Sequence, residues 1–216
     1  MKRISAVIEA VFDLAYLLSA LTLALILLFT VNGNPARLLA GIMGLVLVAG
    51  DACHLLPRVV LARTGREEDL LSALGLGKQA ASITMTLFYL VLWRIGLTLF
   101  SPAGIRPWTL AVYGLALIRI ILCLLPQNEW RQADPPVSWG VVRNIPFFLQ
   151  GMLTAGLFFI NGKAQPGLEL MWLAIVLSFA FYLPVVFWAR KIPALGMLML
   201  PKTMTYLWIL VMCLSL

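Results

Sequence analysis

Charged residues and cysteines are scarce in this chain of 216 residues. Only 12% of the residues are charged, against about a quarter in soluble domains, and the mean hydropathy is +0.98. This shortage excludes a soluble globular protein, a disordered protein and a nucleic-acid-binding domain. The three cysteines are too few and too scattered for a disulfide framework, and the single histidine leaves no Cys/His cluster with zinc spacing.

Long apolar segments dominate what is present, since 62% of the residues are hydrophobic. Seven segments approach or exceed the roughly 20 residues that a helix needs to cross a bilayer. The predicted spans are 5–31, 37–61, 78–100, 107–126, 144–161, 168–189 and 195–215. We therefore predict an all-α, polytopic integral membrane protein with seven transmembrane helices in one domain over residues 1–216.

The ends of these segments carry further information. The apolar part of 5–31 is too long for the core of a cleaved signal peptide, so we interpret it as a retained first span. Residues 62–77 are predicted to form a charged connection that can hold a short interfacial helix. Residues 127–143 form the longest predicted loop, where Pro135-Pro136 excludes a helix.

The distribution of Lys and Arg predicts the orientation of the chain. With the N-terminus in the cytoplasm, the inner ends and loops hold Lys2, Arg3, Arg58, Arg63, Arg66, Lys78, Arg131, Arg143, Arg190 and Lys191. The outer ends and loops hold only Arg37, Arg106 and Lys163. This bias predicts an N-in, C-out protein. We expect it in a bacterial inner membrane.

Polar side chains within the apolar segments fall mainly in one layer near the predicted cytoplasmic side. They are Glu9, Asp13, Asp51, His54, Arg58, Ser82, Arg119, Ser178, Tyr182 and Lys202. Each charged group costs on the order of 3 kcal/mol at mid-membrane, so these groups need partners, water or a function. We interpret the layer as a polar cavity between the helices in the inner leaflet.

The chemistry of these side chains suggests a division of roles. Paired carboxylates can share a proton or polarise a water, so Asp51 with Glu9 or Asp13 forms the candidate catalytic pair. His54 lies one helical turn from Asp51 and joins the catalytic candidates. The predicted substrate-binding residues are Arg119, Lys202, Ser82, Ser178 and Tyr182. The spacing of Asp51 and His54 also suits two metal ligands with Asp13, but we expect no metal and no cofactor.

The stretch AGDACHLLPR, followed by LGLGKQAASITMTLFYLVL, resembles the YhhN-type lysoplasmalogenase-like family over about forty residues. The resemblance implies a polytopic membrane protein that hydrolyses the vinyl-ether bond of lysoplasmalogens, with Asp51 as a functional aspartate. Two departures stand against it. The Ser-Asp pair of a later family helix corresponds to Ser178-Phe179, and the family histidine has no counterpart in ITMTLFYL.

Two classes of function follow from this pattern. The first is a membrane-embedded hydrolase or binding protein for a lysophospholipid- or lysoplasmalogen-type lipid, whose phosphate Arg119 and Lys202 hold. The alternative is a small proton-coupled transporter, or a structural membrane protein whose ion pairs fix helix packing. The expected partner is a membrane lipid, not a nucleic acid, and the sequence leaves the oligomeric state open.

Overall fold

A computed structural model describes residues 2–65 and 67–216 of the chain. Its seven α-helices are α1 (Lys2–Phe29), α2 (Pro35–Thr64), α3 (Glu67–Phe100), α4 (Arg106–Leu124), α5 (Val137–Asn161), α6 (Met171–Trp188) and α7 (Met199–Met212). Short 3-10 helices are η1 (Pro126–Asn128), η2 (Gly162–Ala164), η3 (Pro193–Leu198) and η4 (Cys213–Ser215). The described residues contain no strand, and seven apolar segments are long enough to cross a membrane. The expected all-α membrane fold with seven spans is confirmed.

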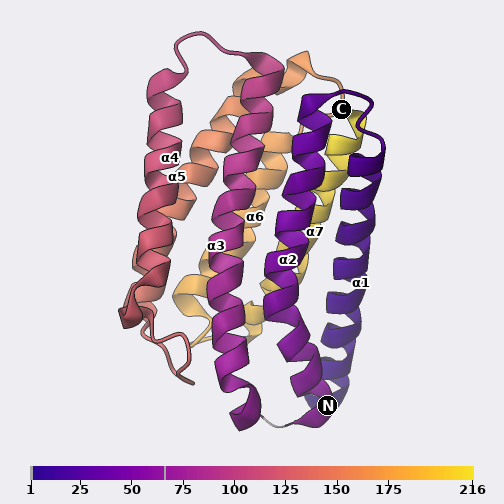
Figure 1. The fold of residues 1–216 in the computed structure, drawn as a ribbon. Coiled ribbons are helices and arrows are strands. Elements are labelled where there is room, and N and C mark those ends of the chain that lie inside the picture. The colour runs from indigo at the N-terminus through magenta and orange to yellow at the C-terminus, as the bar shows by residue number, and fades with distance from the viewer. Residues whose placement is uncertain (1, 66) are drawn as a thin grey trace.

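The helices run alternately up and down, and each lies beside its predecessor in the chain. In Figure 1 the N-terminus and the C-terminus lie at opposite ends of the bundle, as an odd number of crossings requires. Helix α7 returns to pack against α1, so the first and last helices are parallel neighbours. The N-in orientation stays a prediction from the Lys/Arg distribution.

Helices α2, α3 and α5 extend further than predicted at the end of the bundle that carries the N-terminus. Most of residues 62–77, which were predicted to form a connection, belong to α2 and α3. Helix α2 ends before Gly65, which adopts the left-handed conformation (φ 69°). Polar residues limit membrane burial but do not prevent a helix, so both helices continue past the apolar core. The loop predicted over 127–143 is also shorter, because α5 begins at Val137, directly after Pro136. Proline disrupts helix interiors but is tolerated before the first turn.

Helices α2 and α3 approach each other closely where glycine removes the side chain. A Cβ on Gly77 would lie 2.1 Å from the carbonyl oxygen of Cys53. A Cβ on Gly50 would lie 1.7 Å from Oγ1 of Thr84. Small residues commonly allow such contacts between membrane helices. The tight packing fixes the part of α2 that carries Asp51.

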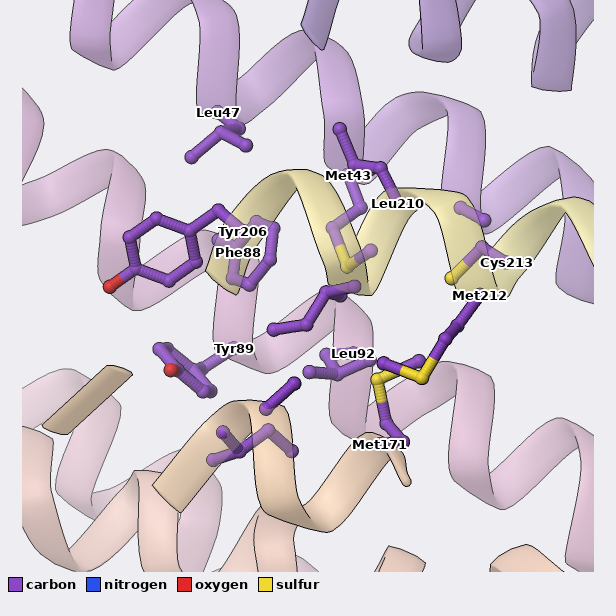
Figure 2. Close-up of a cluster of buried hydrophobic side chains, with 14 of the residues drawn as sticks. Met43, Leu47, Phe88, Tyr89, Leu92, Met171, Tyr206, Leu210, Met212 and Cys213 are labelled. Carbon is purple, nitrogen blue, oxygen red and sulfur yellow. The ribbon is translucent and has the colours of Figure 1, made fainter. Parts of the chain in front are cut away.

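An apolar core fills the half of the bundle nearer the C-terminus. Figure 2 shows its side chains from α2, α3, α6 and α7, among them Met43, Leu47, Leu92, Met171 and Leu210. The aromatic rings of Phe88, Tyr89 and Tyr206 close the core at the end away from Cys213. Within a membrane, close packing replaces the hydrophobic effect as the main attraction between helices. The two tyrosine hydroxyls mark the transition from this core to polar side chains.

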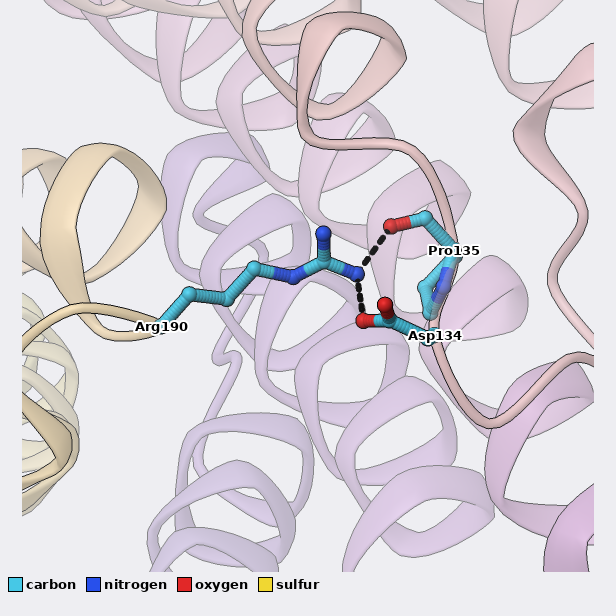
Figure 3. Close-up of polar contacts among 3 residues, drawn as sticks. All are labelled: Asp134, Pro135 and Arg190. Carbon is cyan, nitrogen blue, oxygen red and sulfur yellow. Dashed lines mark hydrogen bonds and ion pairs between the residues drawn. The ribbon is translucent and has the colours of Figure 1, made fainter.

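An ion pair connects two loops at the other end of the bundle. Arg190 follows α6 in the chain. Nη2 of its guanidinium contacts Oδ1 of Asp134 and donates a hydrogen bond to the carbonyl oxygen of Pro135 at 2.6 Å (Figure 3). Asp134 and Pro135 lie in the α4–α5 connection. Both charged side chains are exposed, and exposed pairs add little stability. The contact therefore defines the relative position of the loops more than it stabilises the fold.

Candidate functional site: a buried polar layer

Polar side chains from six helices gather between the apolar core and the N-terminal end of the bundle. We call this set the polar layer: Asp13, Tyr16, Asp51, Arg119, Asn144, Ser178, Tyr182, Lys202 and Tyr206. Its acids lie on α1 and α2, and its cations lie on α4 and α7. The single layer expected from the sequence is therefore divided into an acidic side and a basic side.

The acidic side centres on Asp51. The hydroxyl of Tyr16 donates a hydrogen bond to Asp51 Oδ2 at 2.6 Å, and Tyr16 is only 3% exposed. Asp13 lies one turn before Tyr16 on α1, is 5% exposed and interacts electrostatically with Asp51. Asp13 is thus the carboxylate that the fold brings near Asp51. The direct hydrogen-bond partner of Asp51, however, is a tyrosine.

Glu9 occupies a different position from the one expected. Its Oε2 accepts from Nη2 of Arg58 at 3.2 Å, and both side chains are more than a third exposed. The pair joins α1 to α2 nearer the end of the bundle than Asp51. Glu9 is therefore a member of a peripheral ion pair, and the structure does not place it in a carboxylate pair with Asp51.

His54 lies one turn from Asp51 on α2, as the spacing indicated. Its Nδ1 is buried, and no described residue forms a hydrogen bond with it. The charged groups that act on it are Arg58, Lys78 and Lys202, all cations. An aspartate-oriented imidazole is not formed. Over the described part of the chain, no three His, Cys, Asp or Glu side chains form a group that could hold a metal ion.

Lys202 connects the two sides of the layer. Its Nζ lies 4.4 Å from the ring centre of Tyr182 and 5.3 Å from that of Tyr206. Such cation–π contacts partly replace the water that an ammonium group loses on burial. The same ammonium interacts electrostatically with Asp51 and with Arg119. Lys202 is therefore an ammonium group with an acid on one side and a second cation on the other.

Arg119 is the most deeply buried cation. It is 2% exposed, and its Cζ lies 3.3 Å from the ring centre of Phe147 on α5. Nε and Nη1 have no hydrogen-bond acceptor among the residues that the structure describes. The Cys123 thiol, one turn along α4, is a neighbouring side chain that interacts with the guanidinium. A buried donor without a partner costs about 1–3 kcal/mol, and more when it is charged.

The remaining predicted binding residues separate into two groups. Ser178 is buried and shares a hydrogen bond with the Tyr89 hydroxyl at 2.9 Å, and Tyr182 donates to Asn144 Oδ1 at 3.0 Å. Both belong to the basic side of the layer. Ser82 instead donates to the carbonyl oxygen of Lys78 in its own helix at 2.8 Å. The structure gives Ser82 no contact with the layer.

Several residues that hold the site together were not predicted from the sequence. Tyr16 orients Asp51, Tyr206 and Phe147 provide rings for the two cations, and Asn144 accepts from Tyr182. Helical spacing carried a signal for two of them. Tyr16 follows Asp13 by three residues and Tyr206 follows Lys202 by four, which places each on the face of a charged residue.

The two sides of the polar layer differ in the kind of ligand group that they favour. Arg119 and Lys202 bring two positive charges to the layer, and Asp51 is the carboxylate that acts on Lys202. No carboxylate among the described residues contacts Arg119. The basic side therefore favours an anion, which would fill the vacant donors of the guanidinium. Tyr16 occupies one oxygen of Asp51, so the other is left to hold a water or a substrate hydroxyl.

Comparisons of the chain with protein-family models, with curated proteins and with solved structures gave no match.

Proposed function

We propose that this membrane protein binds a lysophospholipid-type lipid, with the phosphate at Arg119 and Lys202, and hydrolyses it beside Asp51. The observation that supports this most is the Arg119 guanidinium, which is buried with two donor nitrogens unpaired. A purely structural arginine would be expected to face a carboxylate or backbone carbonyls. An arginine that binds an anionic ligand leaves its donors vacant until the ligand arrives.

The chemistry of the two cations favours a phosphate head group. A guanidinium presents a planar fork of donors that matches phosphate oxygens, and an ammonium adds a point charge with rotatable donors. Arg119 and Lys202 interact electrostatically, so one tetrahedral anion near both would relieve their mutual repulsion. Because both lie within an apolar bundle, a ligand with a hydrocarbon chain is favoured over a water-soluble phosphate ester.

Asp51 provides the proposed hydrolytic group. Tyr16 holds Oδ2, so Oδ1 is available to orient and deprotonate a water, and buried Asp13 is the nearby second carboxylate. Vinyl-ether hydrolysis, the reaction that the family resemblance implies, adds a proton to the enol-ether carbon and water to its neighbour. The hemiacetal then breaks into an aldehyde and a glycerol hydroxyl. In this proposal protonated Asp51 first gives its proton to the vinyl carbon that does not bear the ether oxygen, and the resulting carboxylate takes a proton from the water that attacks the carbon bearing that oxygen. When the hemiacetal breaks, Asp51 donates a proton to the departing glycerol oxygen and takes the proton of the hemiacetal hydroxyl, so it ends protonated as it began.

Substitution of Arg119 tests the binding proposal. Arg119→Met keeps the length and apolar stem but removes the unpaired charge. We expect the lipid-free variant in mild detergent to be more stable than the wild type, because a buried charge without a partner is lost. The same variant should lose the anionic lipid that native mass spectrometry detects on the wild type. Arg94→Met, at an exposed arginine on α3, serves as the matched control.

The stability and the bound lipids of Arg119→Met distinguish an arginine that binds an anionic lipid from one that only fixes helix packing. A structural arginine predicts that Arg119→Met loses stability and that its bound lipids equal those of the wild type, which would refute the proposal. Hydrolysis is then tested with lysoplasmalogen vesicles, where Asp51→Asn should abolish release of the aldehyde and retain lipid binding. Equal aldehyde release by wild type and Asp51→Asn would show that Asp51 takes no part in the hydrolysis. Release by neither protein would leave a binding protein without hydrolytic activity.

A further inference from the structure

A third cation, Arg143 on α5, lies beside the basic side of the polar layer. Arg143 precedes Phe147 by four residues, so the two side chains share a face of α5. Phe147 is the ring over which the Arg119 guanidinium lies, at 3.3 Å. Both arginines also interact electrostatically with Tyr182 and with Cys123. The two guanidinium groups therefore belong to one neighbourhood, on the adjacent helices α4 and α5.

The direct partners of Arg143 are neutral. Its Nη1 donates a hydrogen bond to Asn128 Oδ1 at 2.9 Å, and its Cζ lies 4.2 Å from the ring centre of Trp130. Both partners lie in the α4–α5 connection. Among the residues that the structure describes, no carboxylate forms an ion pair with Arg143. These contacts hold the guanidinium in place but do not balance its charge.

The charges of this neighbourhood do not cancel. Asp51 acts on Lys202, while Asp13 lies with Asp51 on the acidic side of the layer. With Asp51 set against Lys202, Arg119 and Arg143 remain as two positive charges without a carboxylate partner in the described part of the chain. A phosphate monoester carries about two negative charges at pH 7. A phosphodiester carries only one, because its second acidic oxygen is esterified.

We infer that the head group of the bound lipid is a phosphate monoester, whose two negative charges lie between Arg119 and Arg143. The inference deepens the proposed function and rests on it. A phosphocholine or phosphoethanolamine head has one phosphate charge and brings an ammonium group of its own, so it would add a cation to a basic site. A monoester also has three free oxygens, which suit the donor forks of two arginines. The expected ligand is a lysophosphatidate, and the expected substrate its alkenyl form.

Three lipids with the same palmitoyl chain test the inference on the whole protein. Palmitoyl lysophosphatidate is a monoester, its phosphomethanol ester has a single charge, and palmitoyl lysophosphatidylcholine is zwitterionic. Native mass spectrometry in mild detergent measures the dissociation constant of each. We expect the wild type to bind lysophosphatidate about tenfold or more tightly than the phosphomethanol ester, because the second charge meets a second arginine. Lysophosphatidylcholine should bind most weakly.

Substitution of Arg143 assigns this preference to one residue. Arg143→Gln removes the charge and keeps an amide that can donate to Asn128. In this variant the two anionic lipids should bind with affinities within about twofold of each other. Arg143→Lys keeps the charge and should keep the preference for lysophosphatidate. Arg131→Gln, at an exposed arginine in the α4–α5 connection, is the matched control and should bind all three lipids as the wild type does.

An arginine that only anchors the α4–α5 connection predicts a different pattern. Equal wild-type affinities for the three lipids, or a preference for lysophosphatidate that Arg143→Gln leaves unchanged, would overturn the inference. The wild-type order of affinities needs no variant, so it tests the inference even where Arg143→Gln does not fold. Failure of the proposed function appears separately, as binding of all three lipids that Arg119→Met does not change.

Discussion

The hydrogen bond between Tyr16 and Asp51 gives the sharpest energetic prediction. Tyr16→Phe removes the donor hydroxyl and keeps the ring, and Asp51→Asn neutralises the acceptor while keeping its shape. The bond measures 2.6 Å and the tyrosine is 3% exposed, so its energy is little screened by solvent. Hydrogen bonds to charged groups contribute about 1.5–3 kcal/mol in proteins.

The energy expected for this hydrogen bond is smaller within a membrane. Coupling energies between polar side chains of membrane helices average about 0.6 kcal/mol and reach about 1.7 kcal/mol, since the unfolded chain in the membrane also finds partners. We expect a coupling of about 1–1.7 kcal/mol for this pair, near the upper end, because the bond is short and buried. Lys202 adds an electrostatic contribution that the Asn substitution also weakens.

A double-mutant cycle measures this coupling directly. The free energy of unfolding is determined in mixed micelles for the wild type, Tyr16→Phe, Asp51→Asn and the double variant. Tyr113→Phe, at an exposed tyrosine on α4, controls for the loss of a hydroxyl as such. A coupling within about 0.3 kcal/mol of zero would show that the two side chains do not interact in the folded protein. The proposed orientation of Asp51 would then be refuted.

Two further predictions concern packing and orientation. Gly77→Ala should destabilise the protein by about 1–3 kcal/mol, because its Cβ would lie 2.1 Å from the Cys53 carbonyl oxygen; Gly114→Ala, which faces open space, should not, and equal unfolding free energies would refute the close approach of α2 and α3. The N-in orientation predicts that, in intact cells, an impermeant thiol reagent labels a cysteine placed at Ser101 but not one at Ser72. Labelling at Ser72 alone would reverse the orientation.

The sequence by itself predicted the class of protein and the number of spans. Apolar segments of about 20 residues suffice for this, because a bilayer satisfies no backbone polar groups and so requires helices. Helix ends were less predictable at 62–77 and 127–143. Charged residues mark where the membrane ends, but a helix can continue into water, as α2 and α3 do.

The sequence also predicted the polar layer and its four charged members, Asp13, Asp51, Arg119 and Lys202, since helical rise converts position into depth. It did not predict the partners across helices. Asp51 meets Tyr16 where a second carboxylate was expected, and Glu9 meets Arg58 instead. Depth along one helix says nothing about the rotation of its neighbours, and those rotations decide which side chains face each other.

Tertiary structure alone decided which buried charges are balanced and which are not. In sequence, Arg119 is one of several cations at the same depth as several acids, and depth alone does not say which of them are paired. In the fold, the acids lie on α1 and α2, while Arg119 stacks on Phe147 with two donors unpaired. The physical reason is geometric: charge balance depends on distances of a few ångströms between helices, and only their packing sets those distances.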